Sequence, residues 1–191
     1  MKKVLSVFLM CCACVSISNA QAKFNAAATK KMSAELAKDT INWTLVNTAI
    51  NAGADVNAPS PNYDPLTTLA MFNGPVETAE LLLKKGAKVN GAIENSTSPL
   101  HYAADNGNIE LMKLLIQYKA NLEVSDGGGS TPLIKAVKSG QYDAVKLLLD
   151  SGADVNAVDG NMKTSLDVSK DEKITALLKS HNAKLFSELQ N

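Results

Sequence analysis

The stretch GADVN at residues 53–57 decides the fold, because it returns at a fixed distance along the chain. It recurs as GAKVN at residues 86–90 and as GADVN at 152–156, and a degraded copy, KANLE, occupies 119–123. Neighbouring copies are 33 residues apart. Self-similarity at a fixed period of this size is the signature of a stacked-repeat solenoid. The sequence therefore predicts small units that stack around one continuous core.

Within one period, the residues predict two helices joined by a turn. Thr131 and Pro132 are typical of a helix start, since a threonine oxygen accepts hydrogen bonds from free amides and proline suits the first turn. This helix is expected to end near Gly140, and the second helix at Gly152, where glycine suits a left-handed backbone. Four residues at helical spacing predict the buried face of the second helix: Tyr142, Val145, Leu148 and Leu149.

These motifs resemble the ankyrin repeat. The family's Thr-Pro-Leu-His start is matched by SPLH at residues 98–101, by TPLI at 131–134 and loosely by TSLD at 164–167, and its closing Gly-Ala-Asp-Val-Asn by the stretches above. The resemblance runs from about Lys31 to Phe186. It implies an all-α solenoid of about five helix-turn-helix units with finger loops and atypical terminal units. Within a domain over 21–191, the expected units are 24–57, 58–90, 91–123, 124–156 and 157–186.

The second unit departs from the period at its first helix. DPLTTLA at residues 64–70 is one residue longer between Leu66 and Ala70 than the third unit is between Leu100 and Ala103, and its loop is one shorter. The start of this helix therefore stays open. A second landmark nevertheless keeps the 33-residue spacing: Ala37, Ala70, Ala103 and Ala136.

Three further departures concern single positions and the two ends. Lys119 replaces the glycine of the other units, so a left-handed backbone there costs roughly 1 kcal/mol. The shortened fifth unit carries KDEK at residues 170–173, which predicts a polar C-terminal cap. In the first unit, five residues are expected to make core contacts: Phe24, Met32, Trp43, Val46 and Ile50.

The N-terminal residues predict a secretory signal peptide over residues 1–20. Two lysines follow Met1, an apolar run covers 4–17, and small residues lead to Ala20 and Ala22. Cleavage after Ala20 fits best, with Ala22 as the alternative. Because a membrane span needs about 20 apolar residues, no stable membrane insertion is expected after cleavage.

The three cysteines, Cys11, Cys12 and Cys14, all fall within this leader. A lipoprotein signal is the less favoured alternative, since the residues around Cys14 fit it poorly. The exported protein then has no cysteine and no disulfide, which a repeat core of this length tolerates. The lysine start suggests a bacterium, so the expected location is periplasmic or secreted.

Charge argues against nucleic acid as a partner. The chain has 19 lysines, no arginine and 19 acidic residues, and removing Lys2 and Lys3 with the leader leaves a net charge of −2. No domain-wide positive field is expected. Arginine, the side chain best suited to bidentate phosphate or guanine contacts, is absent.

Candidate catalytic and metal-binding residues are few, so neither enzyme activity, a metal nor a cofactor is expected. The resemblance implies that His101 braces neighbouring loops, and His181 reads as a solvent-facing helix end. DGGGST at residues 126–131 lacks the lysine and the preceding strand of a phosphate loop, which favours a finger tip. Asp171 and Glu172 read as a solvated face rather than a catalytic pair.

The resemblance places partner binding on a concave face of finger tips and first helices. An exposed aromatic residue is a typical interface anchor, so Tyr63 and Phe72 are the strongest candidates, although Phe72 could equally pack inward. Carrying the family's variable positions over by register gives the candidate surface: Tyr63, Phe72, Asn73, Glu94, Asn95, Asp105, Asn106, Ser130, Lys138 and Lys163.

We therefore expect a monomeric, non-catalytic protein that binds another protein outside the cytoplasm. The resemblance suggests an immunity or inhibitor protein against a toxin or hydrolase, or alternatively an accessory factor for an exported enzyme, such as one handling peroxide. An enzyme or small-ligand site between finger loops is less favoured. End-to-end stacking in the envelope is a further alternative, against which the charges at residues 170–173 argue.

Overall fold

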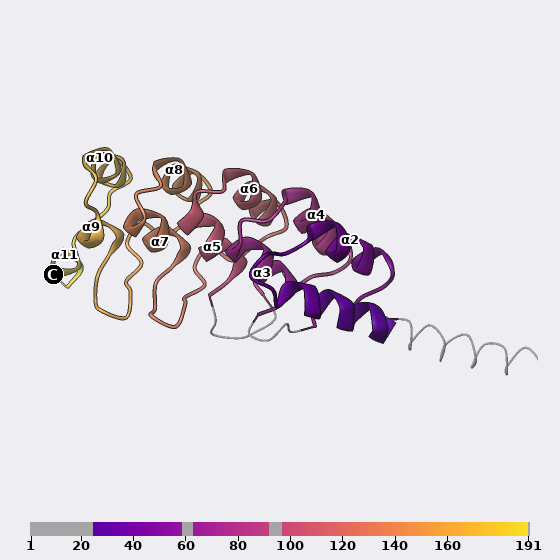
Figure 1. Cartoon of the computed structure of the whole chain (residues 1–191). Coiled ribbons are helices and arrows are strands. Elements are labelled where there is room, and N and C mark those ends of the chain that lie inside the picture. Colours follow the sequence, from indigo (N-terminus) through magenta and orange to yellow (C-terminus); the bar gives the residue numbers. More distant parts are fainter. Residues whose placement is uncertain (1–24, 59–62, 92–96, 191) are drawn as a thin grey trace, which may run out of the picture.

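The computed structural model describes residues 25–58, 63–91 and 97–190, and this part of the chain is a stack of helical hairpins (Figure 1). It contains no strand, only an isolated bridge between Val158 and Thr164. The predicted all-α solenoid is confirmed. The predicted signal peptide and three of the expected contact residues lie outside the described residues: Phe24, Glu94 and Asn95.

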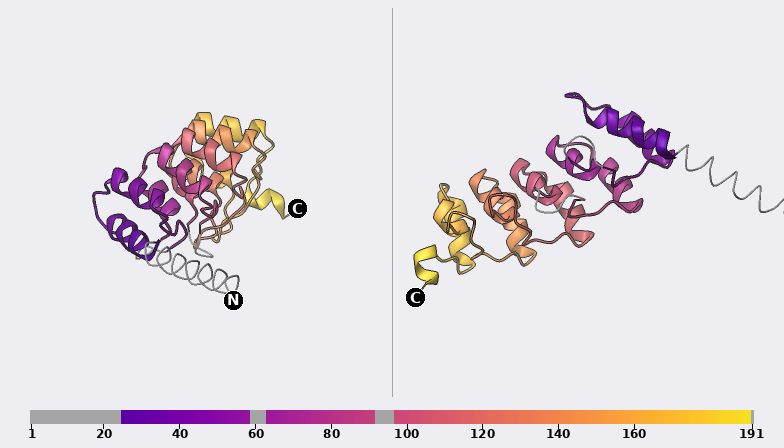
Figure 2. Two further views of the ribbon diagram at one scale, coloured as in Figure 1. Left: turned by 90° about the vertical axis from the view of Figure 1, so that its right-hand side faces the viewer. Right: turned by 90° about the horizontal axis from the view of Figure 1, so that it is seen from below.

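Two rows of helices run along the stack, and each helix packs against its neighbours in the same row (Figures 1 and 2). The first row comprises residues 25–36, α3 (Pro65–Met71), α5 (Pro99–Asn106), α7 (Pro132–Lys138) and α9 (Ser165–Val168). The second row comprises α2 (Trp43–Asn51), α4 (Val76–Lys84), α6 (Ile109–Gln117), α8 (Tyr142–Asp150) and α10 (Glu172–Ser180), and α11 (Phe186–Leu189) follows at the C-terminal end. Long loops, here called fingers, lead from each second-row helix to the next unit.

Capping side chains set the starts of the first-row helices. Thr131 caps α7 with Pro132 at its first position, as predicted. In the second unit, the Asp64 carboxylate accepts a hydrogen bond from the Thr67 amide at 3.0 Å, so α3 begins at Pro65. An aspartate oxygen at this position satisfies an amide that the helix itself leaves free. The open start of this helix is thereby settled.

The extra residue of the second unit lies in the turn between α3 and α4. The same backbone hydrogen bond closes this turn in three units: Gly74 N to Leu69 O, Asn108 N to Ala103 O, and Gln141 N to Ala136 O. Leu69, not Ala70, therefore corresponds to Ala103, and the alanine landmark is wrong for this unit. Ala37 is also wrong as a landmark, because it is exposed and follows the first helix. The helix cap, rather than the 33-residue count, fixes the register.

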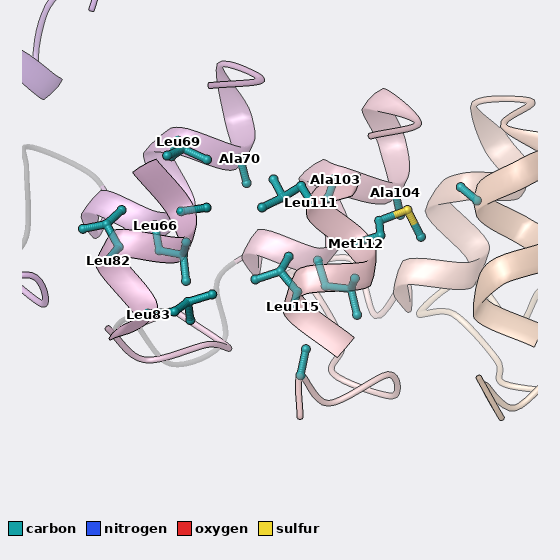
Figure 3. Close-up of a cluster of buried hydrophobic side chains, with 14 of the residues drawn as sticks. Leu66, Leu69, Ala70, Leu82, Leu83, Ala103, Ala104, Leu111, Met112 and Leu115 are labelled. Carbon is teal, nitrogen blue, oxygen red and sulfur yellow. The ribbon is translucent and has the colours of Figure 1, made fainter. Parts of the chain in front are cut away.

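Apolar side chains from both rows form one core that runs through the stack (Figure 3). In α8, Val145, Leu148 and Leu149 are buried as predicted, but Tyr142 is 41% exposed, because it is the first residue of the helix. Lys119 has a φ of 65°, so the predicted left-handed backbone is confirmed there.

The first unit is built as predicted around Met32, Val46 and Ile50, which are buried. Trp43 is partly buried and packs against the core. Its indole lies over the turn that holds the extra residue, where a Cβ added to Gly74 would sit 2.6 Å from Cζ2. A glycine in this turn therefore leaves the space that the ring occupies.

Candidate protein-binding surface

The fingers and the first-row helices lie on the same side of the stack (Figure 1). We call their solvent-facing surface the finger face. All the described candidate residues of the sequence analysis come from these elements and their ends, although Ser130 is buried beneath the surface. Its two halves differ in chemistry: residues 63–73 and 97–108 form the aromatic half, and residues 126–139 and 159–163 form the ionic half.

An edge-to-face tyrosine pair joins two units in the aromatic half. The rings of Tyr63, at the base of one finger, and Tyr102, on α5, have centroids 6.1 Å apart and an interplanar angle of 85°. Burial, and secondly the neighbouring Tyr63 hydroxyl, raise the pKa of Tyr102 to about 12. Sequence reasoning missed Tyr102, although its place in the first turn of α5 could have pointed to it.

Phe72 is the C-terminal cap residue of α3 and is 45% exposed, so it does not pack inward. It lies at the opposite end of α3 from Tyr63, which precedes the N-cap Asp64, so the seven-residue helix, about 10 Å long at 1.5 Å per residue, separates them. The two aromatic residues are thus separate features rather than one patch. The neighbouring Asn73 is exposed, and its side-chain oxygen accepts a hydrogen bond from Asn108 Nδ2 at 2.5 Å.

Asp105 and Asn106 are exposed at the end of α5 that corresponds to Phe72. Asn106 Nδ2 donates to the carbonyl of Ala70 at 3.1 Å, and the Asp105 carboxylate accepts a hydrogen bond from the Ser139 hydroxyl. Both polar side chains therefore link neighbouring units. Part of their hydrogen-bonding capacity is therefore already satisfied by neighbouring units.

In the ionic half, the structure brings two of the predicted residues together around a buried carboxylate. Lys138 Nζ lies 2.9 Å from Oδ2 of Asp159, whose side chain is 1% exposed, and 3.1 Å from Oγ of Ser130. Ser130 is buried and Lys163 is exposed. The Lys138 charge thus serves the stack, since it compensates a carboxylate on the next finger.

Asp126 is the equivalent carboxylate one unit earlier, but its lysine comes from the same unit: Lys135 Nζ, also on α7, lies 3.0 Å from its Oδ2. Burial by itself would raise the pKa of Asp126 and Asp159. Hydrogen bonds from the paired lysines and from backbone amides outweigh it, so both carboxyls have a pKa below the usual range. Each aspartate also fixes its finger, because Oδ1 accepts two backbone amide hydrogen bonds.

The tips of these two fingers are in backbone contact. Gly160 N donates to Gly128 O at 3.0 Å, and a Cβ added to Gly129, which has a φ of +75°, would lie 2.5 Å from Gly160 N. Met162 corresponds to Gly129 in the last finger and has a φ of 58°. The prediction that the glycine-rich stretch forms a finger tip is confirmed.

His101 braces two finger bases, as the resemblance implied. Its Nδ1 accepts from the Ser98 amide at 3.2 Å, so Nε2 carries the proton and donates to the Ser130 carbonyl at 2.8 Å. Burial lowers the pKa of His101. The neutral form of the imidazole is therefore favoured in the folded protein.

The other singled-out polar residues lie at the ends of α10. Asp171 caps this helix, accepting from the amides of Lys173 at 2.8 Å and Ile174 at 3.0 Å, so it is more than a solvated face. His181 ends the helix and is half-buried. Among the described residues, His, Cys, Asp and Glu side chains form no cluster of three that could hold a metal. Within the same part of the chain, no helix has the length and apolarity to cross a membrane.

The family model described as ankyrin repeats, in three copies, matches residues 69–159. The fold is an ankyrin-repeat solenoid. The match spans α3 to the last finger, and the stacked helices continue the solenoid at both ends. Ankyrin repeats are generally protein–protein interaction modules and typically lack catalytic activity. No curated protein matches this sequence.

Proposed function

We propose that this ankyrin-repeat protein binds one protein partner through the aromatic half of its finger face. The observation that carries the proposal is the exposure of Phe72, a large apolar side chain left in water at the end of α3. Exposed aromatic residues are typical anchors, because burying one phenyl ring contributes a large share of an interface's energy. The Tyr63–Tyr102 pair supplies a second aromatic contact with polar tips.

The ionic half supports this binding indirectly. Its buried carboxylates and touching finger tips hold the units in one arrangement, which reduces the conformational entropy lost on binding. Its lysines at positions 135 and 138 are already paired, so they offer a partner little uncompensated charge. The partner's contact surface is accordingly apolar with hydrogen-bonding groups, rather than strongly acidic.

The protein acts outside the cytoplasm in this proposal, as a periplasmic or secreted chain. Support comes from the leader at residues 1–20 and from the placement of every cysteine within it. N-terminal sequencing of the protein recovered from the envelope should begin at Gln21. A start at Met1 would contradict export by cleavage, and a lipid-modified start at Cys14 would replace it with membrane anchoring.

The proposed role is inhibition: an immunity or inhibitor protein that covers the active surface of a toxin or hydrolase. Once a partner is isolated, its own activity tests this role. Activity that falls in proportion to complex formation supports inhibition. Activity that needs the complex would instead support an accessory factor for an exported enzyme.

The partner itself is found by affinity capture from an envelope extract, with the exported chain tagged at its C-terminus. Phe72→Ala should lose the partner, and Tyr63→Ala should weaken its capture. Tyr142→Ala is the matched control, because Tyr142 is a similarly exposed aromatic residue at the start of the second-row helix α8. Equal capture by all folded variants would remove the aromatic half as the binding site.

A further inference from the structure

The N-terminal end of the stack carries an uncovered groove, separate from the finger face. It lies between the helix at residues 25–36 and α2 and has a volume of about 480 Å³. In every later unit, the corresponding face is covered by the helices of the unit before it, as in the contacts of α2 with α4 and of α3 with α5. The groove is therefore the place where one more helical element would continue the existing inter-unit interface.

Two stripes of side chains form the walls. Ala27, Lys31 and Ala34 follow one another at four- and three-residue spacing on one side of the first helix, and Lys38 lines the same wall from the turn that follows this helix. The opposite side of this helix holds the core residue Met32. The second wall is α2, with Leu45 and Ala52. Leu45 is 52% exposed, a high value for a leucine beside an apolar groove.

The small side chains and the lysines of the walls determine which kind of partner fits the groove. Alanines on both walls let a helix backbone approach closely, and Leu45 offers it a large apolar contact. Lys38 is paired with the buried Glu35 at 2.5 Å, whereas Lys31 forms no ion pair with any described residue. The groove thus combines an apolar floor with an uncompensated positive charge on its edge.

This charge also selects between occupants. In a symmetric contact between two copies, the same patch faces itself, so the unpaired Lys31 of each copy would approach a patch that is itself net positive, because Glu35 is already paired with Lys38. Such like-charge contacts are unfavourable in a desolvated interface. A helix with carboxylates on its edge instead complements the lysines.

We propose that this groove binds an amphipathic helix of another protein, with small apolar residues on its buried face and acidic side chains along its edge. Lys31 carries the unpaired charge at the edge of the groove, since Lys38 is held by Glu35. An acidic residue on the edge of the incoming helix meets Lys31. The surface is independent of the aromatic half of the finger face, so either can fail without the other.

The test is a display selection of 20-residue peptides against the exported chain, with Ala34→Trp as the counter-selection bait. Ala34 is exposed, so the indole fills the groove without entering the core, and circular dichroism verifies folding. The selection should enrich helical peptides with acidic residues along one edge of an apolar face. No enrichment, or enrichment of basic peptides, would overturn the proposal.

Two charge-reversal variants on the first helix provide a matched comparison. Lys31→Glu should weaken the selected peptides about tenfold or more, a loss of roughly 1.4 kcal/mol. Lys30→Glu makes the same charge change on the same helix, at an exposed residue that does not line the groove, and should leave affinity within about twofold. Equal losses of affinity in both variants would show that the effect comes from long-range electrostatics rather than from contact in the groove, and would overturn the proposal.

Two other occupants would also overturn it. A photoreactive residue at position 34 that cross-links to residues 21–24 would show that the chain's own N-terminus fills the groove. A dimer in analytical ultracentrifugation that Ala34→Trp converts to monomer would show a second copy there. A monomer with no internal cross-link at residues 21–24 supports an external helix.

Discussion

The two halves of the finger face use their side chains in opposite ways. In the ionic half, Lys135 and Lys138 are paired with aspartates that lie almost entirely inside the stack, and neighbouring fingers touch backbone to backbone. In the aromatic half, Phe72 is left in solvent. The polar side chains of the ionic half stabilise the stack, whereas the aromatic half leaves an apolar side chain available for binding. A residue's position on an ankyrin surface therefore does not tell whether it serves binding or folding.

The finger contact should give the largest stability effect. Gly129→Ala forces a side chain onto a left-handed backbone and against Gly160, so we expect a loss of more than about 2 kcal/mol in unfolding free energy. Gly127→Ala is the control, since a Cβ there meets no atom within 4 Å. Chemical denaturation measures both. Equal stability of the two variants would show that the finger tips do not pack as described.

The buried ion pair comes next. Asp159→Ala removes the Lys138 contact and two backbone hydrogen bonds, and should cost about 2 kcal/mol. Lys138→Met keeps the backbone bonds but leaves the buried Asp159 carboxylate without its counter-charge, so its cost should be at least as large, about 2 kcal/mol or more. A cost for Lys138→Met well below that of Asp159→Ala would show that the carboxylate does not need the lysine.

Acid should destabilise the finger bases in two steps. His101 has a folded pKa below its unfolded value near 6.5, so its contribution is present above that pH and is lost as pH falls through the folded pKa. Asp126 and Asp159 also have lowered pKa values, so theirs is lost only below about pH 4. Denaturation between pH 7 and 3 measures both steps, and His101→Gln should remove the first one alone.

The turn after α3, which borders the aromatic half, should respond less to a similar change. Gly74→Ala places a Cβ against the Trp43 indole, but a partly buried ring can shift, so we expect a loss of about 1 kcal/mol. Trp43 is the single tryptophan of the chain, so its emission reports the shift directly. Unchanged emission with an unchanged unfolding free energy would argue against this contact.

The smallest stability effect should come from the residue on which binding depends most. Phe72→Ala removes an exposed side chain, so unfolding free energy should change by less than about 0.5 kcal/mol. Thermal denaturation checks this. A loss of several kcal/mol in unfolding free energy would mean that Phe72 is packed in the folded protein, which would contradict its role as an exposed binding anchor.

The sequence predicted the fold well because helix caps and left-handed positions are local signals. Thr131 with Pro132, and Lys119, behave as their neighbours along the chain indicate. The predicted register is wrong at Ala70, because Asp64 and Pro65 set the helix start one position early and the compensating extra residue, Pro75, lies in the turn before α4. A repeat count of 33 cannot detect a shift that is corrected within the same unit.

The candidate surface was less predictable, because contacts between units decide which of its side chains remain free to bind a partner. Lys138 reads as a free surface charge in sequence, yet its partner Asp159 is 21 residues away on another finger. Tyr63 likewise meets Tyr102 of the next unit rather than Phe72 of its own. Family register places residues on a face, but it does not show which ones are already paired.

Hydrogen–deuterium exchange of the protein alone and in complex with its captured partner tests the central claim most directly. The account predicts slowed exchange at residues 63–73 and 97–108, with residues 126–139 and 159–163 unchanged. Protection confined to the ionic half, with the aromatic half exchanging as in the free protein, would contradict it.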